Sequence, residues 1–306
     1  MVHGRRLLLA LACAALATAA AACGDGSASG SSQLRVVATT TQAADFARQV
    51  GGARVAVTAL LAPNTDPHEY EVRPGDVKAL ADADLVVRSG GAIDRWLGGA
   101  IDSSGTKAEL LTLSDHVRLR GDDPHWWQDP RNAIAAAAAL RDALVAADPD
   151  GAAAYRRRAA AYTARLARLD KAVAACVAKV PAAQRTLVTT HDSLGYYADR
   201  YGIRVVGAVI PAQTTAAQPS AGETAALVAT IRRERVKAVF AESALNPKVE
   251  AAIARQSGAQ VGHPLWADTL GPRGSDGATY TASIASNTAA LVEGFTGGAV
   301  RCRPAP

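Results

Sequence analysis

Three histidines and one aspartate stand in similar positions along this chain. Beyond residue 22 the sequence holds five histidines: His68, His116, His125, His191 and His263. His68 and His125 each follow an Asp-Pro step in a loop, whereas His191 comes directly after an apolar run. Asp268 lies in a loop after the last, weaker apolar run. Neutral imidazole and carboxylate are good ligands for zinc, manganese or iron, and four such groups would fill a tetrahedral shell.

The spacing of these residues does not by itself identify a metal site. The four candidates are separated by 57, 66 and 77 positions and form no compact motif. Each histidine taken alone is better interpreted as a hydrogen-bonded loop residue. The proline before His68 and before His125 would stiffen its loop, because proline fixes φ and restricts the preceding residue. Ligands held in place in this way lose less freedom when an ion binds.

The elements that must position these residues follow an alternating pattern. Short apolar runs predict strands at 34–39, 55–60, 84–88 and 109–112, and again at 186–190, 203–206, 236–241 and near 260. Helical patterns fall between them near 42–50, 75–82, 92–101, 193–201, 220–234 and 247–257, with a last helix near 278–296. Such alternation predicts an α/β fold with parallel sheets flanked by helices. Ligands of open α/β sheets bind beyond the carboxyl ends of strands, where we place these histidines, with His191 also opening the next helix.

A different kind of segment separates the two sets of strands. Residues 131–147 and 152–179 are rich in alanine, and the second stretch places apolar residues at intervals of three and four, which indicates one helical face. We therefore predict two α/β lobes, 34–150 and 181–306, joined by one long rigid helix over 151–180. Pro181 would stop that helix.

The first residues indicate where the protein works. Arg5 and Arg6 precede an apolar run, and the alanines of 20–22 lead into Cys23, which is the order of a secretory signal peptide. Cys23 and the Gly/Ser-rich stretch after it resemble a bacterial lipobox with a flexible tether, so we expect cleavage after residue 22 and a lipid on Cys23. The protein would then lie on the outer face of the cytoplasmic membrane, with residues 23–33 as its tether. An ordinary signal peptide with a chance cysteine is the alternative.

Charge and cysteine content narrow the function further. The full chain has a net charge of +5, and two of its arginines lie in the leader, which leaves too mild a charge to predict nucleic-acid binding. Beyond the anchor, only Cys176 and Cys302 remain. In an oxidising compartment such a pair is typical of a disulfide, while two free thiols are the alternative.

Four motifs occur in an order that resembles a known family. They are 66–76 (DPHEYEVRPGD), 123–130 (DPHWWQDP), 189–198 (TTHDSLGYYA) and 266–271 (WADTLG). Together they resemble the zinc/manganese solute-binding proteins of ABC importers, the cluster A-I group, over nearly the whole mature chain. Gln128 and Trp126 depart from the residues more usual there.

The resemblance implies a site and a role. Carried over by position, the ligands would be His68 and His125 from the first lobe and His191 and Asp268 from the second. Glu242 would face the cleft and orient a ligand imidazole, although a capping acid is the alternative. Three imidazoles favour Zn²⁺, because manganese members often have a carboxylate in place of His191. The short, histidine-poor stretch 114–124 keeps Mn²⁺ as the alternative cargo. The expected partners are a membrane permease with its ATPase, and we expect a monomer.

Three other functions would make different demands on these residues. A zinc hydrolase would need an open coordination position and a general base, and the residue four after His68 is Val72, so the protease helix motif fails. A role in cell adhesion is compatible with metal binding. A receptor for another solute, such as a siderophore, would not need Asp268.

Overall fold

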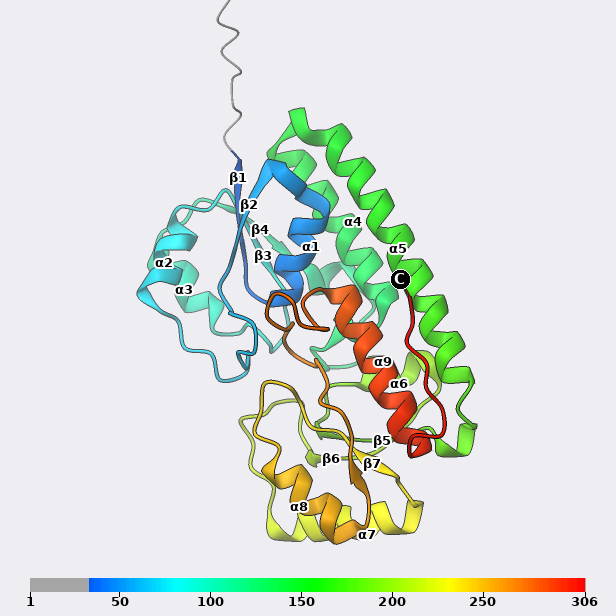
Figure 1. The fold of residues 1–306 in the computed structure, drawn as a ribbon. Helices are drawn as coiled ribbons and strands as arrows, with labels where there is room; N and C mark the ends of the chain where they lie inside the picture. Colours follow the sequence, from blue (N-terminus) through cyan, green and yellow to red (C-terminus); the bar gives the residue numbers. More distant parts are fainter. Residues whose placement is uncertain (1–32, 306) are drawn as a thin grey trace, which may run out of the picture. The chain divides into compact units, whose positions relative to one another are not determined.

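The first four strands form one parallel sheet. The computed structural model describes residues 33–305, so the expected signal peptide and Cys23 lie outside the described residues. The strands pair in the order β2-β1-β3-β4, with bounds β1 (Leu34–Ala38), β2 (Val55–Ala59), β3 (Leu85–Arg88) and β4 (Glu109–Thr112). The central strands β1 and β3 are mostly apolar and buried, because helices cover both of their faces (Figure 1). These strands lie where the sequence predicts them.

The second set of strands repeats this order. Two parallel pairs, β5-β6 and β7-β8, have the bounds β5 (Thr186–His191), β6 (Arg204–Ile210), β7 (Ala238–Val239) and β8 (Gln260–Val261). A parallel bridge between Thr189 and Phe240 joins the pairs, which gives the order β6-β5-β7-β8. The predicted strand 236–241 was too long. Beyond β7 the chain continues as isolated bridges, the last of which pairs Glu242 with Leu265.

Several helices begin at residues whose side chains cap them. The α-helices between the strands are α1 (Thr41–Gly51), α2 (Pro74–Ala81), α3 (Leu97–Ser104), α4 (Pro130–Ala147), α6 (Gly195–Tyr201), α7 (Ala221–Glu234) and α8 (Lys248–Ser257). Short 3₁₀ turns are η1 (Gly52–Arg54), η2 (Leu113–His116), η3 (Trp126–Gln128), η4 (Pro149–Gly151) and η5 (Ala182–Gln184). Asp129 caps α4 by accepting from the Arg131 N–H, and Ser220 and Glu223 form a capping box on α7.

The predicted helix 92–101 was wrong at its start. Gly90 and Gly91 have positive φ angles of 90° and 69°. The buried Asp94 carboxylate accepts hydrogen bonds from the Thr39 hydroxyl and the Arg88 guanidinium. These tertiary contacts hold the segment in turns, and α3 begins only at Leu97.

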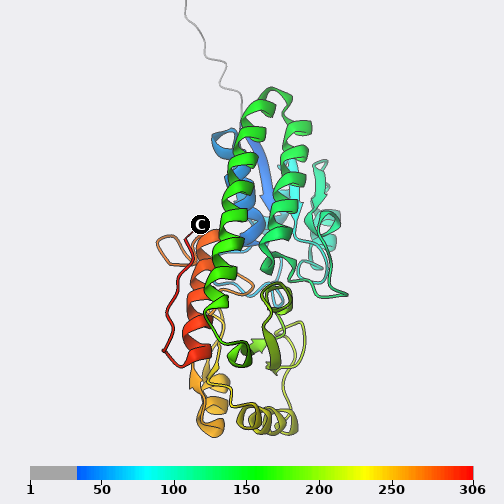
Figure 2. The ribbon, with the colours of Figure 1, turned by 90° about the vertical axis from the view of Figure 1, so that its right-hand side faces the viewer.

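One long helix, α5 (Ala152–Ala178), packs against elements from both halves of the chain. It contacts α1 and α4 and also α6 and α9 (Tyr280–Thr296), as Figures 1 and 2 show. Its predicted apolar face is buried, and Asp170 accepts hydrogen bonds from Arg200 and Tyr201. The division into two lobes with α5 as the link stays a prediction. Within residues 33–305, no helix is both long enough and apolar enough to span a membrane.

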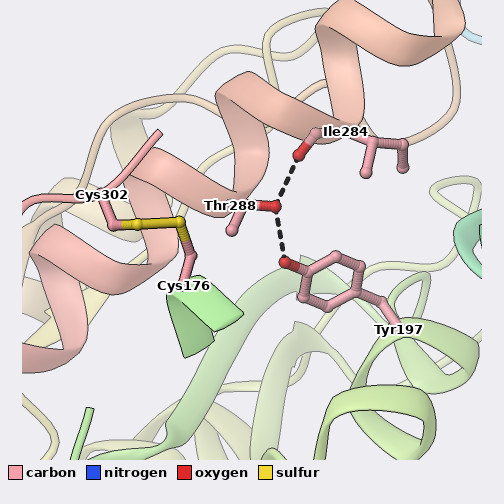
Figure 3. Close-up of a disulfide and its surroundings, with 5 residues drawn as sticks. All are labelled: Cys176, Tyr197, Ile284, Thr288 and Cys302. Atoms are coloured by element: carbon pink, nitrogen blue, oxygen red, sulfur yellow. Dashed lines mark hydrogen bonds between the residues drawn. A yellow bond between two sulfur atoms is a disulfide. The ribbon is translucent and has the colours of Figure 1, made fainter. Parts of the chain in front are cut away.

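The C-terminal segment is fastened to α5 by a disulfide. Cys176 in the last turn of α5 is joined to Cys302, with the two Cα atoms 5.5 Å apart (Figure 3). Nearby, the Thr288 hydroxyl donates to the Ile284 carbonyl at 2.7 Å. Because that hydroxyl has one hydrogen, the Tyr197 hydroxyl must be the donor in its 2.8 Å contact with Thr288. A buried hydrogen bond therefore holds the middle of α9, and a covalent bond holds the segment after the helix.

Candidate metal centre

The structure brings His68, His125, His191 and Asp268 together. His68 lies in the loop after β2, His125 directly before η3, His191 at the end of β5, and Asp268 in the loop after β8. One donor atom from each lies within 4.8 Å of the others. The side chains are enclosed, with exposed fractions of 4%, 0%, 0% and 5% in the same order. An ion at this place would be surrounded by protein and separated from bulk water.

The distances between donor atoms suit a small tetrahedral ion. Asp268 Oδ2 lies 3.1 Å from His68 Nε2 and 3.2 Å from His191 Nε2, and the Nε2 atoms of His125 and His191 are 3.2 Å apart. A tetrahedron with metal–ligand bonds of about 2.0–2.1 Å has edges of roughly 3.3–3.4 Å. The other oxygen, Asp268 Oδ1, is buried without a hydrogen-bond partner among the described residues. A bound cation would balance the negative charge of this buried carboxylate.

Two carboxylates accept hydrogen bonds from the imidazoles. The Glu242 carboxylate accepts from His191 Nδ1 at 2.6 Å, and Asp123 accepts from His125 Nδ1 at 2.8 Å. Each ring therefore keeps a hydrogen on Nδ1, and its Nε2 faces the centre, where it would bind the ion once any proton on it is lost. From the sequence we expected Glu242 to orient a ligand imidazole, and such a role requires this hydrogen bond to His191.

Sequence reasoning missed Asp123. Its other contact follows a local rule, because its carboxylate also accepts the backbone N–H of His125, as Asp66 does for His68. An aspartate that accepts the N–H two residues on is an Asx turn. The repeated Asp-Pro-His pattern was the available signal, and it sets the backbone of both loops.

Other residues considered from the sequence lie elsewhere. His263 is exposed and lies 4.0 Å from Glu293, and His116 is exposed at the end of η2. Trp127 is buried with its ring 5.5 Å from that of His125, whereas Trp126 packs against Phe46. The expectation that His191 opens a helix was wrong, because α6 begins only at Gly195.

The buried charges of the centre shift one another's pKa values. Burial opposes a charge on His191, but the carboxylates of Asp268 and Glu242 outweigh it and raise the His191 pKa well above its usual value. Burial acts to raise the pKa of Asp268, but His191 and His125 lower it well below the usual value. Burial raises the pKa of Glu242, partly offset by His191. Without metal, the centre therefore holds a protonated His191 beside an ionised Asp268.

Metal binding should weaken as the pH falls. The raised pKa of His191 stabilises the metal-free fold fully below about pH 6.5, and this contribution is lost as the pH rises through the raised value. The lowered pKa of Asp268 stabilises the metal-free fold fully above about pH 3.9, and this contribution is lost as the pH falls through the lowered value. The metal-free pair is thus most stabilising between these limits, where the ion must displace a proton. The gap in melting temperature between zinc-loaded and metal-free protein should be wider at pH 8 than at pH 5. A gap independent of pH would contradict this.

Comparisons with known proteins agree on one family. A family profile described as "Zinc-uptake complex component A periplasmic" matches residues 36–294. The manganese-binding lipoprotein MntA of Bacillus subtilis is 31% identical over 269 residues, which cover 83% of this chain and 87% of the relative. The zinc-binding protein TroA of Treponema pallidum is 29% identical over 270 residues, which cover 84% and 87%.

A solved structure agrees with the sequence comparisons. The periplasmic zinc-binding protein TroA from Treponema pallidum superimposes with a TM-score of 0.80 at 26% identity. The superposition covers 86% of this chain and 99% of that one. The likeness includes the parallel sheets flanked by helices, as the sequence predicts.

Proposed function

Because the chain belongs to the family of the zinc-uptake complex component A, the metal solute-binding proteins of ABC importers, we propose that it captures one Zn²⁺ and delivers it to a permease. A protein of this family is a binding protein and not an enzyme. The proposed ligands are His68, His125, His191 and Asp268. The metal is the cargo, so the site must both hold it and release it.

The observation that carries the proposal is the buried set of four donors. Three imidazole nitrogens and a carboxylate oxygen lie within 4.8 Å of one another at separations close to a zinc tetrahedron. Imidazole-rich sites favour zinc over manganese, which prefers oxygen ligands. Four protein donors also differ from the three donors and open position of a catalytic zinc site.

Manganese is the second candidate, and one observation favours it. Asp268 Oδ1 is buried without a partner and lies 3.5 Å from His125 Nε2. Both oxygens of Asp268 could therefore bind one ion, which would give the higher coordination number that manganese accepts. The relative MntA is named for manganese, and TroA is named for zinc.

Several features around the site belong to the same proposal. Glu242 and Asp123 would orient the imidazoles that bind the ion. The two sets of strands would be the cores of two lobes, with α5 as the link between them. A lipid on Cys23 would hold the protein on the outer face of the cytoplasmic membrane. The partners of the family are a permease and its ATPase, and they would receive the ion.

The test is a metal titration of a soluble form that begins at Gly24, stripped with a chelator. We expect one zinc ion per chain, with zinc bound more tightly than manganese in parallel calorimetric titrations. Tighter binding of manganese would leave the site intact and overturn the choice of metal. Binding of neither ion would overturn the proposed function. The Asp268→Ala variant separates a metal site from one for a larger solute, which would not need this carboxylate.

A further inference from the structure

One backbone oxygen joins the loops that carry two of the proposed ligands. The Ala267 carbonyl, directly before Asp268, accepts a hydrogen bond from Gln128 Nε2 at 2.8 Å. It accepts a second one from Trp127 Nε1 at 3.0 Å. Both donors follow His125 closely in sequence, and their side chains are almost wholly buried. The position of Asp268 is thus tied to the segment of His125.

Further hydrogen bonds attach the Asp268 loop to the first half of the chain. The Thr41 hydroxyl accepts from the Leu270 N–H at 2.8 Å, and the Thr269 hydroxyl accepts from the Asn64 N–H at 3.1 Å. The Asp45 carboxylate accepts from the Tyr280 N–H at 3.0 Å. The loop and the start of α9 therefore pack on α1 and on the loop that carries His68.

The attachment changes at a single step of the backbone. Leu265 N–H donates to the Ala241 carbonyl, next to β7, and Trp266 N–H donates to Asn287 of α9. The next residues hydrogen-bond to the first half of the chain, Ala267 to η3, Thr269 to the loop after β2 and Leu270 to α1. His191 differs, since it ends β5 and is held by Glu242 beyond β7. The segments of His68, His125 and Asp268 are thus hydrogen-bonded to the first half of the chain, whereas His191 is held by the second set of strands.

Gln128 is an unexpected residue for this buried position. Its Oε1 atom has no hydrogen-bond partner among residues 33–305. A buried polar atom without a partner destabilises a fold, and an apolar side chain of similar volume would avoid that. The Ala267 carbonyl already has Trp127 as a donor, so Gln128 is not needed to satisfy it. The fold therefore gains little from this amide, which points to a role at the neighbouring carboxylate.

We propose that Gln128 is a positioning residue that prolongs the residence of the bound metal by holding Asp268 against His68 and His125. The inference rests on the proposed function and deepens it. The Gln128 amide donates to the Ala267 carbonyl and acts on Asp268 through it. Without its amide the Asp268 loop is held by one donor fewer at this point, and the carboxylate leaves the ion more readily.

The test separates an effect on release from an effect on folding. Purified full chain, loaded with zinc, is mixed with excess chelator, and dissociation is followed for wild type and Gln128→Leu. We expect dissociation about 3- to 10-fold faster in the variant, the size of effect given by one hydrogen bond, with an unchanged association rate. The melting temperature of the metal-free protein should change little, because the variant also removes the unpartnered oxygen.

Matched variants keep the result interpretable. Gln128→Met, which is flexible and apolar, serves if leucine packs poorly, and Gln260→Leu on the exposed strand β8 is the control. Wild-type dissociation rates in both Gln128 variants would overturn the inference while leaving the proposed function standing. Slower association without faster dissociation would also overturn it. Failure of the wild-type chain to bind zinc would overturn the proposed function, and this inference with it.

Discussion

Replacing His191 by alanine should lower the zinc affinity of this protein by roughly 10²- to 10³-fold. Free energies of binding for four-ligand zinc sites are about 10–16 kcal/mol, so an even share per ligand is about 2.5–4 kcal/mol. His191 is wholly buried, and its ring ends 3.2 Å from both Asp268 and His125. A water molecule entering the space left by the ring would replace the ligand only in part. Competition titration with a chelator of known affinity measures the loss.

The same variant should also destabilise the metal-free protein. His191 is the cation between the Asp268 and Glu242 carboxylates, and its removal leaves both with less compensation in a buried place. The zinc-induced rise in melting temperature should shrink together with the affinity. His263→Ala is the control, because that imidazole is exposed and lies away from the centre. Equal affinity in wild type and His191→Ala would remove His191 from the ligand set.

Glu242→Gln should give a smaller loss from the same part of the site. The amide keeps the shape of the carboxylate but weakens the contact that holds His191 Nδ1 at 2.6 Å. Residues that orient a metal-bound imidazole typically change affinity about 10- to 100-fold. A loss as large as that of His191→Ala would mean that Glu242 binds the ion directly.

The sequence predicts the frame of this protein better than the details of its centre. The central strands β1 and β3 follow from short apolar runs, since a strand in the middle of a parallel sheet is covered on both faces, and the edge strands β2 and β4 follow from weaker, partly exposed runs. The four proposed ligands follow from their motifs, each at or beyond the end of a strand. The structure adds the separations between their donor atoms, because residues 57 to 77 positions apart meet only through the packing of whole elements.

The predictions failed where tertiary contacts override local pattern. The Asp94 carboxylate accepts hydrogen bonds from Thr39 and Arg88, so the segment from residue 92 forms turns although its pattern predicts a helix. The predicted strand 236–241 breaks up after β7, where Glu242 pairs with Leu265 and reaches His191. The Ala267 carbonyl lies far from Trp127 and Gln128 in sequence, and no local pattern reveals their hydrogen bonds. In each case a hydrogen bond to a residue distant in the chain decides the local structure.

Loss of the Cys176–Cys302 disulfide should destabilise the whole fold without weakening metal binding. The bridge closes a loop of 126 residues, and the chain-entropy model gives about 5 kcal/mol for a loop of that length. For a chain of this size that corresponds to a fall in melting temperature of roughly 8 °C. The measurement is urea unfolding of the double variant Cys176→Ser/Cys302→Ser, compared with wild type under oxidising and reducing conditions. Reduced wild type should match the double variant.

The neighbouring hydrogen bond provides the control for this prediction. Tyr197→Phe removes the hydrogen bond to Thr288 beside the bridge (Figure 3) and should lower the free energy of unfolding by only about 1 kcal/mol. The loss is small because α6 and α9 both stay packed on α5 and the chain stays cross-linked. Zinc affinity should change little in either variant, since neither cysteine is among the four proposed ligands or their carboxylate partners. Unfolding free energies within 1 kcal/mol for the double variant and wild type would contradict the prediction. They would mean that packing of α9 on α5 already restrains the C-terminal segment, so that the covalent bond adds nothing to it.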